Sequence, residues 1–295
     1  MGPGVRRDDE SLFREFASMS SATISSLKNL SGTIVLAGAG KMGGAMLAGW
    51  LAGGLDARQA VVIEPVPSDE IDALVKTGVR LNPPATDVGA VETLVIAVKP
   101  QSFAEAGARL KPLVGPSTLV VSIMAGATIA SISQICGGAV VRAMPNTPAA
   151  IGRGITVAVA ANTVSAAQRA TTDALLRAVG SVEWVDDEQL MDAVTAVSGS
   201  GPAYIFLLAE ELARAGVEAG LPAELATRLA RETVAGAGEL LHRSEASSAT
   251  LRQNVTSPGG TTAAALEVLM GAGGMQSLLT RAVAAATKRS KELAK

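Results

Sequence analysis

The stretch that decides the fold of the first part of the chain is Thr33-Ile-Val-Leu-Ala-Gly-Ala-Gly-Lys-Met-Gly43. Residues 33–37 form a short apolar run rich in β-forming residues, which predicts a buried strand. The next six residues fit the pattern G-x-G-x-x-G, and a helix-like stretch covers 41–52. A strand, a glycine loop and a helix in this order predict a dinucleotide-binding site of the Rossmann type.

Each glycine of this loop has an expected task. Gly38 makes the tight turn, Gly40 lets the pyrophosphate approach the backbone, and Gly43 lets the helix pack on the strand. Lys41 and Met42 lie between the last two glycines. We therefore expect all five residues to contact the cofactor.

The acid at the end of the next apolar run, 60–64, is the candidate for contacting the adenosine ribose. Glu64 follows Gly43 by about 20 residues, a spacing at which a carboxylate binds the ribose hydroxyls and favours NADH over NADPH. The next three residues are Pro-Val-Pro, so no arginine follows closely to receive a 2′-phosphate. The alternative is that Glu64 is merely solvated at a strand end. The sequence thus favours NADH slightly and leaves NADPH open.

Short β-rich runs alternate with helical patterns as far as residue 185. The runs lie at 33–37, 60–64, 93–98, 118–123, 140–143, 155–160 and 182–185. The helical patterns lie near 41–52, 68–76, 101–110 and 165–178. This alternation predicts an α/β fold with a doubly wound parallel sheet.

Three loops that follow strand runs are expected at the cofactor crevice, because ligands of such sheets bind at the carboxyl ends of the strands. One covers residues 122–126, and the other two carry candidate residues. In the first, Val98-Lys99-Pro100, the lysine could reach a phosphate or the nicotinamide region. It could equally be a solvated cation. In the second, Met144-Pro-Asn-Thr-Pro148, Asn146 and Thr147 could order the nicotinamide amide or only cap the turn.

The chain changes character near residue 186, where the strands stop. Helical patterns fill 187–197, 202–219, 222–242, 261–270 and 275–294. We therefore expect a loosely ordered extension at 1–30, a dinucleotide-binding domain at 31–185 and an all-helical domain at 186–295.

A proline- and glycine-rich loop, Val255-Thr-Ser-Pro-Gly-Gly-Thr-Thr262, opens directly onto one of these helical patterns. Pro258 fixes one backbone angle, and the two glycines after it allow conformations that other residues resist. Either of the final threonines can cap the helix. Such a loop turns N–H groups toward one point at the positive end of a helix dipole, which suits a carboxylate. The alternative is an ordinary helix start with a flexible lead-in.

A second motif of the helical half, Ser198-Gly-Ser-Gly-Pro-Ala-Tyr204, leads into a long apolar helix. Its serines, its backbone and its tyrosine hydroxyl could face a polar ligand. A structural turn between two helices explains the same residues.

Composition excludes several classes of protein. The net charge of the 295 residues is −2 and only 2% of them are aromatic, so nucleic acid and anionic membranes are not expected partners. No stretch is long and apolar enough for a membrane span, and no signal-peptide core follows the first basic residues. The single cysteine, Cys136, fits a reducing cytoplasm. With His242 as the one histidine, no Cys/His metal site is expected.

Five motifs together resemble the pyrroline-5-carboxylate reductase family, over about residues 32–294. They are GAGKMG at 38–43, AVKPQ at 97–101, VVRAMPNTP at 140–148, DAVTAVSGSGPAY at 192–204 and NVTSPGGTT at 254–262. The resemblance implies an NAD(P)H-dependent reductase that converts the cyclic imine 1-pyrroline-5-carboxylate to L-proline, the last step of proline synthesis. It also implies an intertwined dimer through the helical domain, often assembled into larger rings. The site is then expected between one subunit's nucleotide domain and its partner's helices.

The same resemblance assigns the residues of the substrate loop. It implies that the substrate carboxylate binds the backbone at Ser257, Gly259, Gly260 and Thr261. Thr262 is expected to hydrogen-bond the ring nitrogen and to be the catalytic residue. Asn254 matches a position near the cofactor.

Two departures from the family pattern concern cofactor choice. Many members have an Asn-Arg-Ser type sequence after the second strand, suited to a 2′-phosphate, where this chain has Glu64-Pro-Val-Pro67. An asparagine of some relatives has no clear counterpart in Asn82-Pro-Pro-Ala-Thr86.

Two other functions compete with imine reduction. A β-hydroxyacid dehydrogenase shares the domain plan but uses a lysine of the helical half as acid and base, and this chain has no lysine between Lys111 and Lys288. A nucleotide-sensing module without catalysis would have no need of a carboxylate-binding loop.

Overall fold

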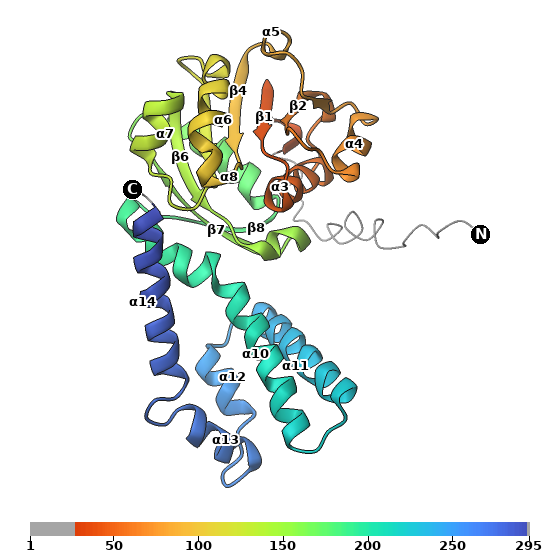
Figure 1. Ribbon diagram of the computed structural model, residues 1–295, viewed down its shortest axis with the longest axis vertical. Coiled ribbons are helices and arrows are strands. Elements are labelled where there is room, and N and C mark those ends of the chain that lie inside the picture. The colour runs from red at the N-terminus through yellow and green to blue at the C-terminus, as the bar shows by residue number, and fades with distance from the viewer. Residues whose placement is uncertain (1–26, 294–295) are drawn as a thin grey trace, which may run out of the picture. The chain divides into compact units, whose positions relative to one another are not determined.

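The computed structural model describes residues 27–293, and one mixed sheet forms the centre of its first part (Figure 1). The sheet has eight strands in the order β3-β2-β1-β4-β5-β6-β7-β8. The strands are β1 Thr33–Ala37, β2 Ala60–Ile63, β3 Arg80–Leu81, β4 Val91–Ile96, β5 Leu119–Ser122, β6 Ala139–Met144, β7 Gly154–Ala160 and β8 Gly180–Trp184. The predicted α/β class is confirmed. Of these strands, the short β3 was not predicted.

Helices connect most of the strands. They are α3 Lys41–Ala52, α4 Asp69–Val75, α5 Ala85–Val88, α6 Phe103–Leu110, α7 Ile129–Cys136 and α8 Ala166–Arg177. The sequence pattern predicted four of them and missed α5 and α7.

The sheet is not parallel throughout, which corrects the prediction. β6 and β7 are antiparallel, with Val141 opposite Ala160, while the other neighbouring strands are parallel. The cause is the connection between them. A parallel pair needs a crossover of a dozen or more residues, whereas only a short 3₁₀ helix, Thr147–Ile151, links β6 to β7. The chain therefore reverses direction at the end of β6.

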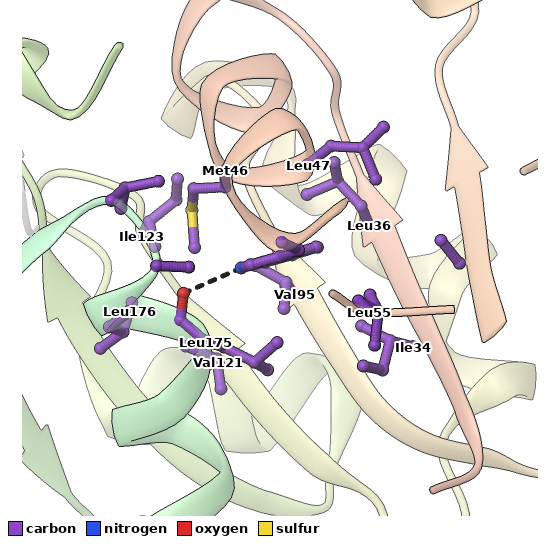
Figure 2. Packing of buried hydrophobic residues seen from close by; sticks show 14 of the residues in the cluster. Ile34, Leu36, Met46, Leu47, Leu55, Val95, Val121, Ile123, Leu175 and Leu176 are labelled. Atoms are coloured by element: carbon purple, nitrogen blue, oxygen red, sulfur yellow. Dashed lines mark hydrogen bonds between the residues drawn. The ribbon is translucent and has the colours of Figure 1, made fainter. Parts of the chain in front are cut away.

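Alternating strand residues build a core on each face of the sheet. Ile34 and Leu36 of β1 face α3, α4 and α8, and contribute to the larger cluster of buried side chains shown in Figure 2. Val35 and Ala37 point the other way, toward α6 and α7. Because successive strand side chains point to opposite faces, an apolar run without alternation predicts burial on both sides.

Trp50 of α3 links two of the covering helices. Its side chain is fully buried, and its indole N–H donates a 2.8 Å hydrogen bond to the carbonyl of Leu175 in α8, the dashed line in Figure 2. We expect Trp50→Phe to lower the free energy of unfolding by about 1–3 kcal/mol, because it leaves that carbonyl without its partner. Urea denaturation measures this. Trp184→Phe is the matched control, since Trp184 is only partly buried, and an equal loss in both variants would contradict the prediction.

The remaining helices follow β8 without further strands. They are α9 Met191–Val194, a π-helix Thr195–Gly199, α10 Gly201–Glu218, α11 Ala223–Arg243, α12 Ser248–Asn254, α13 Thr261–Leu269 and α14 Met275–Leu293. Among residues 27–293 no helix is both long and apolar enough to cross a membrane.

The chain divides into two compact units, and their boundary differs from the expected one between residues 185 and 186. The first unit ends at Gly199 and also contains the chain from Thr287 onward, and the second unit is Ser200–Ala286. One cause is a 2.6 Å hydrogen bond from the Ser290 hydroxyl to the Asp192 carboxylate, which ties the end of α14 to α9. Gly126, in the loop after β5, also lies against Leu293.

The expected extension at 1–30 lies mostly outside the described residues, which begin at Leu27. Leu27 is fully buried and belongs to the larger core cluster. Leu27 is therefore packed, while Lys28 and Asn29 after it are exposed.

Candidate functional site

The loops expected to bind the cofactor meet at one edge of the sheet. Strands β1, β4, β5 and β6 are neighbours and run parallel, so their carboxyl ends share that edge. The strand order reverses between β1 and β4, and ligands of such sheets bind in the crevice at this point. The Gly38 loop follows β1 and the Lys99 loop follows β4, so these two predicted loops flank the crevice.

The three glycines occupy positions that explain their type. Gly38 has a φ of +93°, and an added Cβ would lie 2.7 Å from the carbonyl oxygen of Ala97. A Cβ on Gly43 would lie 2.0 Å from the carbonyl oxygen of Gly38. Gly40 differs, because nothing lies within 4 Å of its added Cβ. The first and last glycines thus serve the fold, and the middle one leaves open space where a pyrophosphate would approach.

Glu64 directly follows β2, and its carboxylate reaches the glycine loop. Oε2 accepts a 2.8 Å hydrogen bond from the backbone N–H of Ala39, and Oε1 accepts one of 3.1 Å from Val66. Both backbone groups of Glu64 are bonded to the side chain of Asn82. The carboxylate is therefore held beside the expected cofactor position and is not simply solvated. The pairing with Asn82 had no signal in the sequence, because it depends on β3 lying beside β2.

The residues after β4 and β6 have more modest surroundings. Lys99 and Pro100 are exposed, and Val98 is half-buried, at the start of a 3₁₀ helix, Pro100–Ser102. The Asn146 side-chain oxygen accepts a 2.9 Å hydrogen bond from the backbone N–H of Ile155 in β7. Asn146 thus ties its loop to the reversing strand.

The expected carboxylate loop lies in the second unit, between α12 and α13. Gly259 has a φ of +68°, and an added Cβ on Gly260 would lie 2.4 Å from the Ser257 hydroxyl oxygen. Gly260 is the N-cap residue, and no described side chain caps the helix. The expected threonine cap is therefore wrong, because Thr261 and Thr262 are already the first two helical residues.

The missing cap has a chemical consequence. The first N–H groups of a helix have no partner inside it, and a side-chain oxygen normally accepts from one of them. In α13 no side chain of the described residues caps these donors, which lie beside the loop at the positive end of a nine-residue helix. An uncapped helix start of this kind suits an anion such as a carboxylate. Asn254, the last residue of α12, is exposed just before the loop.

The Ser198–Tyr204 motif is neither a simple loop nor a simple turn. Its first two residues belong to the π-helix Thr195–Gly199, and α10 begins at Gly201. A Cβ on Gly199 would lie 2.5 Å from the terminal carbon of Met144 at the end of β6. The buried Ser198 hydroxyl has no hydrogen-bond partner among the described residues. Single π-helical turns occur frequently at functional sites.

Two residues that could support other chemistry do not form a site. Within residues 27–293 no cluster of three or more His, Cys, Asp or Glu side chains could hold a metal. Burial raises the pKa of the Cys136 thiol, and the nearby charge of Lys111 opposes this only in part. The thiol therefore stays protonated at neutral pH, which does not suit a nucleophile. His242 lies in the last turn of α11, outside the predicted motifs.

Comparison with known proteins agrees with both halves of this description. The family model described as "Pyrroline-5-carboxylate reductase dimerisation" matches residues 188–293, and "NADP oxidoreductase coenzyme F420-dependent" matches 33–126. The pyrroline-5-carboxylate reductase of Pseudomonas aeruginosa is 40% identical over 264 residues, which cover 88% of this chain and 96% of that protein.

Solved structures give the same result. A pyrroline-5-carboxylate reductase from Coxiella burnetii has a TM-score of 0.83 at 36% identity and covers 90% of this chain and 100% of its own. A pyrroline carboxylate reductase from Plasmodium falciparum with NADP bound has a TM-score of 0.76 at 28% identity, with 90% and 99% covered. Relatives this similar along nearly their whole length show that the chain belongs to the pyrroline-5-carboxylate reductase family.

Proposed function

We propose that this chain reduces 1-pyrroline-5-carboxylate to L-proline with hydride from NAD(P)H. The observation that carries the proposal is the uncapped start of α13 behind a glycine loop, which suits the substrate carboxylate. It stands in a chain that matches reductases of this substrate over 88% of its length.

The reaction needs little acid–base catalysis from the protein. The imine nitrogen is basic enough to arrive protonated, and a bound nicotinamide would supply the hydride to the electrophilic carbon, which would leave a secondary amine. The protein mainly has to hold both reactants in register and exclude water.

The residue roles follow from this division of work. The backbone of four residues would bind the substrate carboxylate: Ser257, Gly259, Gly260 and Thr261. The Thr262 hydroxyl would hydrogen-bond the ring nitrogen. Eleven residues would contact the cofactor: Gly38, Gly40, Lys41, Met42, Gly43, Glu64, Val98, Lys99, Pro100, Asn146 and Asn254. Support for the role of Gly40 is the open space beside it, since nothing lies within 4 Å of an added Cβ there.

The deciding experiment follows nicotinamide absorbance with 1-pyrroline-5-carboxylate, in parallel with NADH and with NADPH. We expect oxidation of the cofactor and an equal amount of L-proline, identified by chromatography. Measurable cofactor binding without oxidation would favour the nucleotide-sensing module.

Glu64 is the residue proposed to set the slight preference for NADH. Its carboxylate accepts a hydrogen bond from the Ala39 N–H. At this position it would bind the ribose hydroxyls and repel a 2′-phosphate. Glu64→Ser should move the ratio of kcat/KM for NADH over NADPH toward NADPH by about tenfold or more, because hydrogen bonds to charged groups contribute about 1.5–3 kcal/mol. Glu70→Ser, a change at an exposed residue of α4, is the charge-matched control. An unchanged ratio in Glu64→Ser would show that Glu64 does not contact the ribose.

We propose self-association through the second unit, as a dimer or a ring of dimers. Large apolar side chains are exposed there when the chain is considered alone, among them Phe206 at 66% and Val268 at 76%. Extensive exposed apolar surface marks contact sites. Light scattering of the purified protein gives the size of the assembly.

A cytoplasmic location is proposed from the single, unpaired cysteine.

A further inference from the structure

Asn82 has an unusual backbone conformation at the end of β3. Its φ is +48°, and it is the one non-glycine residue with positive φ in the part of the chain that the structure describes. This left-handed region favours glycine, and asparagine is among the few other residues that tolerate it. Unlike glycine, asparagine brings a side-chain amide that can form hydrogen bonds from this position.

The Asn82 amide forms its hydrogen bonds with a single residue directly after the neighbouring strand. The Asn82 side-chain nitrogen donates a 2.8 Å hydrogen bond to the carbonyl of Glu64, and its side-chain oxygen accepts one of 2.9 Å from the Glu64 N–H. Its own backbone N–H donates to the carbonyl of Val62 at 2.8 Å. The paired residues of β2 and β3 end at Val62 and Leu81. The Asn82 amide thus continues the pairing beyond the last strand residues.

Glu64, which Asn82 holds in this way, directs its side chain to the glycine loop. The Glu64 carboxylate accepts hydrogen bonds from Ala39 at 2.8 Å and from Val66 at 3.1 Å. A chain of contacts therefore runs from the Asn82 amide through the Glu64 backbone to the first loop of the nucleotide site. The amide thus holds the Glu64 backbone beyond the last paired residues of β2 and β3.

We propose that Asn82 is a positioning residue for cofactor selection. It fixes Glu64 so that the carboxylate stays at the glycine loop, where an adenosine 2′-hydroxyl can bind and a 2′-phosphate is repelled. This proposal rests on the proposed function, and it assigns to Asn82 no contact with the cofactor itself.

Asn82→Gly is the sharpest test, because glycine keeps the left-handed backbone and removes only the amide. We expect the ratio of kcat/KM for NADH over NADPH to fall by about three- to tenfold, the size of one or two lost hydrogen bonds. In the Glu64→Ser background the same substitution should leave the ratio unchanged, since the carboxylate it positions is gone. Asn162→Gly, in an exposed loop after β7, is the matched control.

Two results would overturn the proposal. One is a ratio within twofold of the parent protein in Asn82→Gly. The other is an equal fall of the ratio in the Glu64→Ser background, which would show that Asn82 acts without Glu64. Calorimetric Kd values for NADH and NADPH repeat the test without turnover. If the parent protein binds both cofactors and reduces no pyrroline-5-carboxylate, the proposed function fails while the role of Asn82 is still tested.

Discussion

Gly43→Ala is expected to weaken binding of either nicotinamide cofactor by about 5- to 150-fold, because fitting an extra methyl group into a packed site typically costs about 1–3 kcal/mol. The added Cβ would lie 2.0 Å from the Gly38 carbonyl oxygen and 3.3 Å from the side chain of Ala97. The nearest atom belongs to the backbone of the loop itself, so α3 or the loop has to move. Calorimetric titration with NADPH and NADH measures the loss.

Gly44→Ala provides the matched control one residue further along α3. Its added Cβ would lie 3.5 Å from the nearest atom, which is an ordinary contact. Alanine also favours a helix over glycine by about 1 kcal/mol, so this variant should bind cofactor normally and melt no lower than the parent. If Gly43→Ala binds the cofactors as tightly as Gly44→Ala does, then Gly43 is not needed for close packing of α3 on β1.

Thr262→Ala is expected to lower kcat/KM for 1-pyrroline-5-carboxylate by about 10- to 100-fold, the range for one hydrogen bond to a charged group. The cofactor Kd should stay within about twofold, because Thr262 is not among the residues proposed to contact the cofactor. Steady-state kinetics at saturating cofactor, together with calorimetry, measure both quantities. Unchanged kcat/KM would exclude the proposed bond to the ring nitrogen.

Two neighbouring substitutions separate the hydroxyl from the backbone. Thr262→Ser keeps the hydroxyl and should restore most of the activity. Thr261→Ala should have little effect, since the proposed contact of Thr261 is made by its backbone N–H. Equal losses in Thr261→Ala and Thr262→Ala would indicate a general disturbance of the start of α13.

Sequence periodicity predicted the elements that bury a regular face. The strand 33–37 and the helix 41–52 are confirmed at both ends, because a glycine loop separates two unambiguous patterns. α7 was missed, since its eight residues include three isoleucines and two serines, which are poor helix formers. Strand direction was also missed. Apolar runs carry no direction, and the short link through Thr147–Ile151 decides it.

The candidate site, like the fold, could be predicted from the sequence only in part. The turn at Gly38, the close packing at Gly43 and the nearness of Glu64 to the loop depend on short-range pattern, and the structure agrees with them. The pyrophosphate contact at Gly40 stays a prediction. The amide of Asn82 and the contact of Gly199 with Met144 join segments far apart in the sequence. Single-sequence patterns do not report such pairs. The roles of the substrate-loop residues came from family resemblance and stay predictions.

The hydrogen bond between Asp192 and Ser290 joins residues 98 positions apart. Synthesis at about 5–20 residues per second would therefore delay this contact by roughly 5–20 s after Asp192 is made. During that interval the sheet can form on the ribosome, but the loop at Gly126 still lacks its contact with Leu293. The nucleotide-binding half is thus translated before the helical half but completed only after it.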